Sequence, residues 1–101
     1  MDISKFLSDS EIVKEWLDQE RSFLEDQDAY LSYWFYNKGV GVSITKDLCG
    51  EFHMMKNGTY TVHVESGDGV SLYEHSSKTN DSQVIKNAFA NFEKRVCNED
   101  I

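Results

Sequence analysis

The residues with the greatest capacity for chemistry are three histidines in the second half of the chain. His53, His63 and His75 lie in segments that also contain Glu51 and Tyr73. Imidazole, carboxylate and phenol groups are the usual components of metal sites and of acid–base pairs. If these five side chains share one face of a sheet, they form a candidate enzyme or metal site. The alternative is an ordinary polar face in contact with solvent.

The strand pairing expected for these segments gives the cluster an unfavourable geometry. We expect two cross-strand rows on the outer face of the sheet, namely Glu51–His63–Tyr73 and His53–Thr61–His75. The backbones at His53 and His75 would then lie about 9 to 10 Å apart, which is wide for two ligands of one metal ion. The chain has no nucleophile elbow, phosphate-binding loop or HExxH motif. We therefore predict no catalytic residue, no metal ion and no cofactor, and an enzyme remains the alternative hypothesis.

Acidic side chains are concentrated at the N-terminal end. Residues 1–28 contain nine acidic and three basic residues, so they carry −6 of the total charge of −8. At 100° per residue, four carboxylates fall on one line of a helix opposite its apolar stripe: Glu11, Glu15, Asp18 and Glu25. This acidic ridge is either a solvated helix face or a docking strip for a basic surface. Four carboxylates over about 21 Å compare with roughly six phosphates on one DNA strand, so the mimicry of DNA is partial.

A run of aromatic residues supplies candidate anchors for a partner. Tyr33, Trp34, Phe35 and Tyr36 lie in a predicted strand and therefore alternate between its two faces. Only one face can enter the core, and the other is either covered by another element or exposed as a protein-binding hot spot. A nucleic-acid stacking platform would need basic neighbours, of which only Lys38 is close in sequence.

Glu20 interrupts the apolar stripe of the N-terminal helix, close to Trp16 on the helical wheel. A carboxylate is not buried there without a partner, because the loss of hydration is too costly. We expect Glu20 at the rim of the core, bonded to a tyrosine hydroxyl or a backbone N–H, or free to accept an arginine or lysine of a partner.

Two helices are predicted, one on each side of the central part of the chain. Ser8 and Glu11 have the spacing of a capping box for a helix over residues 9–26, and Asn80 and Gln83 repeat it for a helix over residues 81–97. Each helix carries an apolar stripe at helical spacing. The stripes contain Ile12, Val13, Trp16, Leu17, Phe23 and Leu24 in the first helix, and Val84, Ile85, Ala88, Phe89, Phe92 and Val96 in the second.

The segment between the helices changes to a period of two and is rich in β-formers. It predicts five strands: Tyr30–Tyr36, Val40–Ile44, Leu48–Met55, Thr59–Glu65 and Val70–His75. The connections are short and contain turn residues, so neighbouring strands should be antiparallel. A three-residue loop with Gly58 in the left-handed conformation sets Phe52 and Met54 on the core face beside Tyr60, Val62 and Val64.

The same reasoning at the next turn, Gly67–Asp68–Gly69, assigns the residues of the fifth strand to the two faces of the sheet. It puts Val70 and Leu72 on the core face and leaves Ser71, Tyr73 and His75 outside. The predicted fold is a single α+β domain over residues 1–101, in which an N-terminal helix, a five-strand antiparallel meander sheet and a C-terminal helix form a two-layer sandwich.

Composition narrows the classes of function. The N-terminal sequence resembles neither a signal peptide nor a membrane span, which favours a cytoplasmic protein. The strong negative charge argues against direct binding to nucleic acid or to an anionic membrane and favours a basic protein partner.

In size, charge and α+β pattern the chain resembles small acidic inhibitors encoded by phages, including anti-CRISPR and anti-restriction proteins, and immunity proteins that neutralise nuclease toxins. The resemblance implies a non-enzymatic protein that occupies a basic, nucleic-acid-handling surface of its partner. Glu11, Glu15, Asp18 and Glu25 would supply charge, and the four aromatic residues at 33–36 would supply anchors. The alternative within the binding class is an immunity protein or antitoxin for a cognate toxin.

Overall fold

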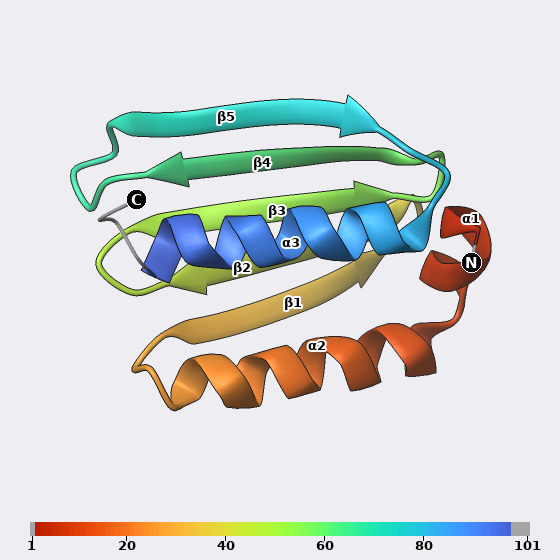
Figure 1. The fold of residues 1–101 in the computed structure, drawn as a ribbon, viewed down its shortest axis with the longest axis horizontal. Helices are drawn as coiled ribbons and strands as arrows, with labels where there is room; N and C mark the ends of the chain where they lie inside the picture. The colour runs from red at the N-terminus through yellow and green to blue at the C-terminus, as the bar shows by residue number, and fades with distance from the viewer. Residues whose placement is uncertain (1, 98–101) are drawn as a thin grey trace.

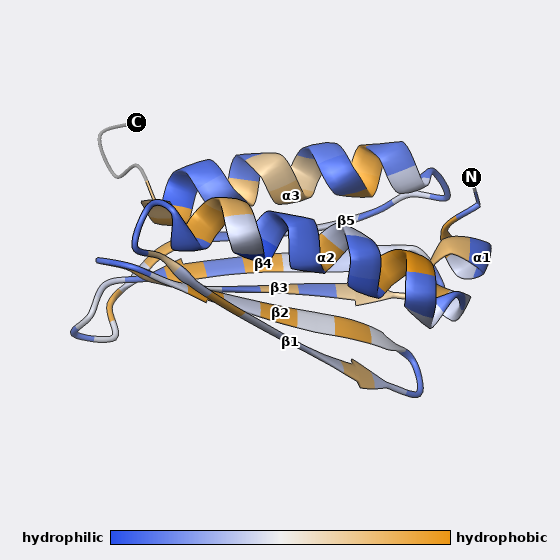
Figure 2. Cartoon of the chain, turned by 90° about the horizontal axis from the view of Figure 1, so that it is seen from below, coloured by the Kyte–Doolittle hydropathy of each residue, from blue (hydrophilic) through white to orange (hydrophobic). Residues whose placement is uncertain are grey.

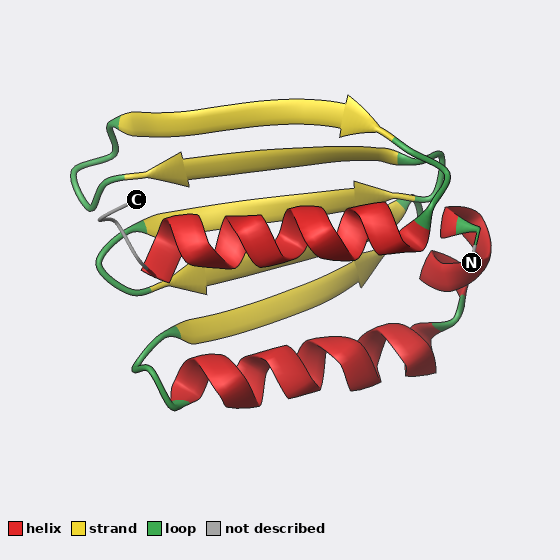
Figure 3. Ribbon diagram, in the orientation of Figure 1, coloured by secondary structure: helices red, strands yellow, loops and turns green. Residues whose placement is uncertain are grey.

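The computed structural model describes residues 2–97 and confirms the predicted α+β architecture (Figure 1). Antiparallel strands follow one another through short turns, with helices before and after them (Figure 3). The helices are α1 (Ile3–Ser8), α2 (Ser10–Glu25) and α3 (Ser82–Cys97), and the strands are β1 (Tyr30–Tyr36), β2 (Gly39–Thr45), β3 (Cys49–Met55), β4 (Thr59–Glu65) and β5 (Ser71–Lys78).

The strands form one open sheet in the order β1-β2-β3-β4-β5, so the meander is confirmed. Phe52 lies opposite Val62 and Met54 lies opposite Tyr60, which is the predicted register of β3 and β4. Gly58 has a φ of 96°, as the three-residue loop requires, because an L side chain rarely adopts that conformation. Within the described residues, no helix is both long enough and apolar enough to cross a membrane.

The core lies between one face of the sheet, here called the inner face, and helices α2 and α3 (Figure 2). Phe52 of β3 is fully buried, and its ring lies 5.3 Å from that of Phe89 and 5.4 Å from that of Phe92. Trp16 of α2 completes the contact between the helices, with its ring 5.1 Å from that of Phe89. No described element covers the opposite face, here called the outer face.

Both helix starts differ from the predicted capping boxes by one residue. Ser8 is the last residue of α1, and Asp9 caps α2 by accepting a hydrogen bond from the backbone N–H of Ile12 at 3.2 Å. Asp81 caps α3 in the same way, accepting from the N–H of Gln83 at 2.9 Å. An aspartate adjacent to the predicted serine or asparagine satisfies the helix N-terminus equally well, so the sequence pattern allows both positions.

The prediction for the faces of β5 is wrong. Val62 pairs with His75 and Val64 with Tyr73, so these two β5 residues lie on the inner face. A β-bulge between Val64 and Glu65 shifts the register, because β5 contributes the extra residue Leu72 there. A shift of one residue exchanges the two faces of every later position. Leu72 is consequently exposed, as is Val70 before it.

Two residues of the predicted apolar stripes also lie outside the core. Phe23 of α2 is 59% exposed and Val84 of α3 is 40% exposed. Both lie at the edges of their stripes, where a helix seated on a sheet buries only its central residues. Single exposed apolar residues of this kind are common on folded proteins.

Candidate protein-binding surface

The acidic ridge is presented to solvent by α2. Glu11, Glu15, Asp18 and Glu25 are all exposed, whereas Val13, Leu17 and Leu24 are buried on the opposite side of the same helix. The packing of α2 against β1 thus fixes the direction in which the ridge points. The ridge is therefore a pre-formed line of carboxylates on a regular element.

Asp18 connects the ridge to the aromatic strand. The hydroxyl of Tyr33 donates to Asp18 Oδ1 at 2.8 Å, and an Arg21 nitrogen lies 3.6 Å from the same oxygen. The Arg21 guanidinium also lies 5.0 Å from the centre of the Tyr33 ring and donates to the backbone carbonyl of Leu31 at 3.3 Å. Burial, followed by the hydrogen bond to Asp18, raises the pKa of Tyr33. One carboxylate of the ridge is thus held by the chain's own residues, and Arg21 reduces the local charge.

The four predicted anchors fall into two separate pairs. Tyr33 and Phe35 lie on the α2 side of β1 with their rings 5.9 Å apart, and Phe35 is 39% exposed. Trp34 and Tyr36 lie on the outer face, where Trp34 is 40% exposed. Only Tyr33 and Phe35 are therefore continuous with the acidic ridge. The outer face of β1 is therefore exposed, and Phe35 is also partly exposed at the rim of the inner face.

The five-residue histidine cluster does not form. Because the bulge reverses β5, Tyr73 and His75 lie on the inner face, and only Glu51, His53 and His63 remain on the outer face. Within residues 2–97, no three His, Cys, Asp or Glu side chains come together as a set that could hold a metal ion. The geometry on which the alternative enzyme hypothesis depended is therefore absent from the described part of the chain.

The two outer histidines make separate local contacts. His53 Nε2 lies 3.0 Å from Glu51 Oε1, and His53 Nδ1 lies 3.5 Å from the Tyr36 hydroxyl. His63 lies between Glu74 Oε1, at 3.0 Å from Nδ1, and Glu65 Oε2, at 3.4 Å from Nε2. The hydrogen bond to Glu65 raises the pKa of His63, burial opposes that effect, and the bond to Glu74 raises it further.

We expect Glu65→Gln to lower the pKa of His63, because the amide cannot stabilise the imidazolium as a carboxylate does. An NMR titration of the His63 ring protons measures the pKa directly. Glu25→Gln is the control, since Glu25 is an exposed glutamate of α2, on the opposite side of the sheet from His63. A His63 pKa that is the same in wild type and Glu65→Gln would contradict the contact between the two side chains.

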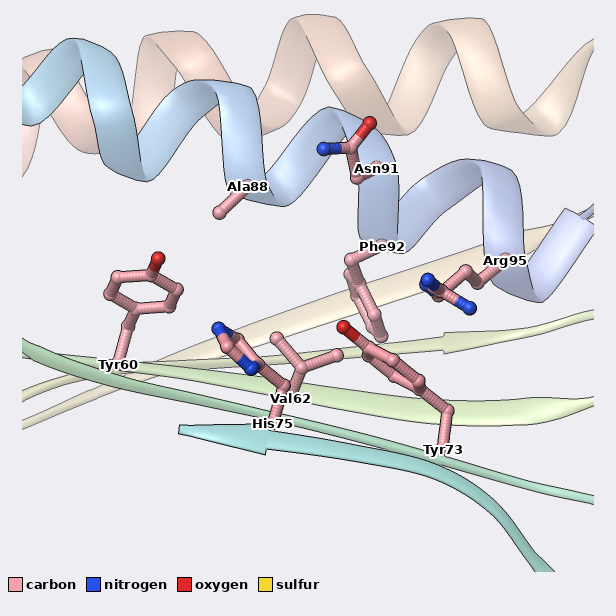
Figure 4. Close-up of a pocket in the computed structure, with 8 residues that line it drawn as sticks. All are labelled: Tyr60, Val62, Tyr73, His75, Ala88, Asn91, Phe92 and Arg95. Carbon is pink, nitrogen blue, oxygen red and sulfur yellow. The ribbon is translucent and has the colours of Figure 1, made fainter. Parts of the chain in front are cut away.

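The displaced residues Tyr73 and His75 line a hollow between β5 and α3 (Figure 4). Its volume is about 140 Å³, and Tyr60, Phe92 and Arg95 form other parts of its wall. The Arg95 guanidinium lies 3.6 Å from the centre of the Tyr73 ring, which is a cation–π contact. The hollow is thus small, and Arg95 already occupies one side of it.

Glu20 has a partner that the sequence did not reveal. Its carboxyl group is hydrogen-bonded to that of Glu93 on α3, and Glu93 Oε2 is buried without a hydrogen-bond partner. Burial, followed by the hydrogen bond and the negative charge of Glu20, raises the pKa of Glu93 to about 8. The expected partners of Glu20, a tyrosine hydroxyl or a backbone N–H, are replaced by a second carboxyl group. The spacing in the C-terminal helix was one indication of this contact. Glu93 follows the buried Phe89 by four residues and therefore lies on the same side of α3.

Comparison with known proteins gives no assignment for this arrangement: no family model, curated protein or solved structure matches the chain.

Proposed function

We propose that the chain is a non-enzymatic inhibitor that binds a basic, nucleic-acid-handling surface of a partner protein through the acidic ridge. In this role it is a partial DNA mimic of the phage counter-defence type, acting in the cytoplasm of the host cell. The observation that supports the proposal is the ridge itself. Three of its carboxylates, Glu11, Glu15 and Glu25, form no ion pair within the described part of the chain.

Unpaired carboxylates on a fixed helix favour a basic partner for an electrostatic reason. Lysine and arginine groups that normally neutralise phosphates can approach the ridge without displacing an existing intramolecular partner. The adjacent rings of Tyr33 and Phe35 add a partly exposed apolar contact at the end of β1. Asp18 contributes less, because Tyr33 and Arg21 already hold it.

The test compares charge reversal on the ridge with an equal reversal elsewhere. Glu15→Lys/Glu25→Lys should weaken binding to a captured basic partner by at least about tenfold and flatten its dependence on salt. This pair leaves the first-turn Glu11 and the Tyr33-bonded Asp18 untouched. The readout is the dissociation constant at several salt concentrations, together with elution of the partner by competing DNA.

Asp47→Lys/Asp68→Lys is the control, since both residues are exposed in turns and the double variant changes the net charge by the same +4. If both double variants weaken binding equally, the effect comes from the net charge of the protein and not from the ridge. A partner that DNA does not displace would contradict occupation of a nucleic-acid site. Capture of a cognate nuclease toxin would instead identify the chain as an immunity protein.

A further inference from the structure

The outer face of the sheet carries an aromatic surface that the acidic ridge does not involve. The indole of Trp34 lies across Gly41, on the neighbouring strand β2, so closely that any Cβ at that position would collide with the ring. The ring of His53 lies 5.8 Å away at 74°, on the next strand. Glycine at position 41 thus lets the indole of Trp34 rest against the sheet. Trp34 itself remains 40% exposed.

Tyr36 extends this surface toward the end of the sheet. Its position is two residues from Trp34, which is about 7 Å along the strand on the same face. The Tyr36 hydroxyl donates to Met55 Sδ at 3.2 Å, and its ring lies 6.4 Å from that of His53. Burial raises the pKa of Tyr36, so its hydroxyl stays neutral at physiological pH. Two aromatic rings and a thioether therefore follow one another along this part of the outer face.

Two lysines lie where this surface ends. Lys38 and Lys56 belong to adjacent turns, which are joined by a hydrogen bond from the Lys56 N–H to the Lys38 carbonyl at 2.7 Å. Among residues 2–97 neither ammonium group takes part in an ion pair, although the protein carries a net charge of −8. With Asn37, Met55 and Asn57 they line a hollow of about 380 Å³. Two neighbouring positive charges without a counter-ion favour an anion with more than one negative charge.

The asparagine side chains add hydrogen-bonding groups to the same hollow. Asn57 Oδ1 accepts from the backbone N–H of Thr59 at 2.9 Å, which leaves the amide nitrogen of Asn57 as a donor. The site thus combines a stacking surface, a pair of cations and neutral polar groups. The volume of the hollow that contains the two lysines lies within the range of small-molecule sites, roughly 300 to 1,000 Å³.

We propose that this corner of the outer face binds a nucleoside polyphosphate, with its base on Trp34 and Tyr36 and its phosphates on Lys38 and Lys56. Lys38 lies in the turn that follows β1, four residues beyond Trp34, so their backbones are separated by at most about 13 Å. A nucleoside di- or triphosphate spans this separation, whereas inorganic phosphate does not. A long single-stranded nucleic acid is a weaker candidate, because its further phosphates would meet a strongly acidic protein.

The test is a titration of the isotope-labelled protein with ATP, followed by NMR. ATP should shift the indole N–H signal of Trp34 and the amide signals of Lys38 and Lys56 in a saturable manner. The indole N–H of Trp16, packed between Phe6 and Phe89 on the other side of the sheet, should not move. Adenosine, which lacks the phosphates, should bind at least about tenfold more weakly, and tripolyphosphate should shift the lysine amides without shifting Trp34.

Matched variants separate the two halves of the site. Lys38→Gln/Lys56→Gln should weaken ATP binding by at least about tenfold. Lys46→Gln/Lys94→Gln makes the same change of charge at two exposed positions, one at the opposite end of β2 from Lys38 and one in the last turn of α3, and should leave the affinity within about twofold. Trp34→Ala should remove the preference for ATP over tripolyphosphate.

Three results would overturn the proposal. One is the absence of saturable shifts with millimolar ATP, GTP, CTP and UTP. Another is equal affinity for ATP and tripolyphosphate, which would leave a polyanion site without base contact. The third is tighter binding of a single-stranded oligonucleotide than of ATP at physiological salt, which would make the surface a nucleic-acid interface. None of these results depends on the acidic ridge.

Discussion

Phe52→Ala should lower the free energy of unfolding by about 3 to 5 kcal/mol, the range found when a buried phenylalanine is truncated to alanine. Phe52 is fully buried, and three aromatic rings contact it. Its own ring stacks at 5.9 Å on that of Tyr60 and contacts Phe89 and Phe92 of α3. The substitution therefore leaves a cavity where the sheet and α3 pack together, and equilibrium unfolding in urea measures its cost.

Phe23→Ala is the matched control, since it removes the same atoms from a residue that is 59% exposed. It should change the free energy of unfolding by less than about 1 kcal/mol. The sequence pattern alone places Phe23 in the apolar stripe of α2 and predicts a large loss. If the two substitutions cost the same, α2 is rotated relative to the orientation described here, and the ridge would point elsewhere.

The elements of this fold could be predicted because their periodicities are strong and change at clear boundaries. β3 and β4 alternate between buried and more exposed residues over seven positions, and both long helices carry apolar residues at helical spacing. The register of β3 and β4 was also predictable, because the alternative would have placed Glu51 and His53 in the core. Gly58 then had to adopt a positive φ, which the structure confirms.

The faces of β5 could not be predicted in the same way. Val70 and Leu72 are more apolar than Tyr73 and His75, so a pattern argument assigns the first pair to the core. The bulge reverses this order, so that Tyr73 and His75 lie on the inner face and line the hollow beside α3. Arg95 of α3, whose guanidinium stacks on Tyr73, contributes to this placement from more than twenty residues away. The alternation of residues within one strand cannot predict a contact with a residue so distant in the sequence.

In the candidate surfaces too, features set by local periodicity could be predicted and features set by tertiary packing could not. The exposure of the acidic ridge follows from its position opposite the stripe, so it was predictable from the helical wheel. The separation of Tyr33 and Phe35 from Trp34 and Tyr36 was equally predictable from strand alternation. The meeting of Lys38 and Lys56 at the end of β1 and β3, and that of Glu20 with Glu93, depends on how distant segments pack.

Glu93→Gln should raise the free energy of unfolding at pH 8, because it removes a carboxyl group that is costly to ionise in the folded protein. The pKa of Glu93 is about 8 in the fold and 4.5 in its ordinary state. Between these values the folded state retains a proton that the unfolded state has released. The free energy of unfolding of the wild type should therefore fall as the pH rises from about 5 to about 8. Each pKa unit corresponds to about 1.4 kcal/mol, and water partly screens this half-buried side chain, so we expect a gain of about 1 to 2 kcal/mol.

The difference between Glu93→Gln and wild type, measured by urea unfolding at pH 5, 6.5 and 8, isolates this pair from other titrating groups. The raised pKa of His63 acts in the same direction in both proteins and cancels in the comparison. Glu25→Gln is the control, because Glu25 is an exposed glutamate of α2. A gain that is as large at pH 5 as at pH 8 would show that the proton is not shared between α2 and α3. A gain that appears only above pH 5 means that the helix carrying the acidic ridge is bound more firmly to α3 in acid than in alkali.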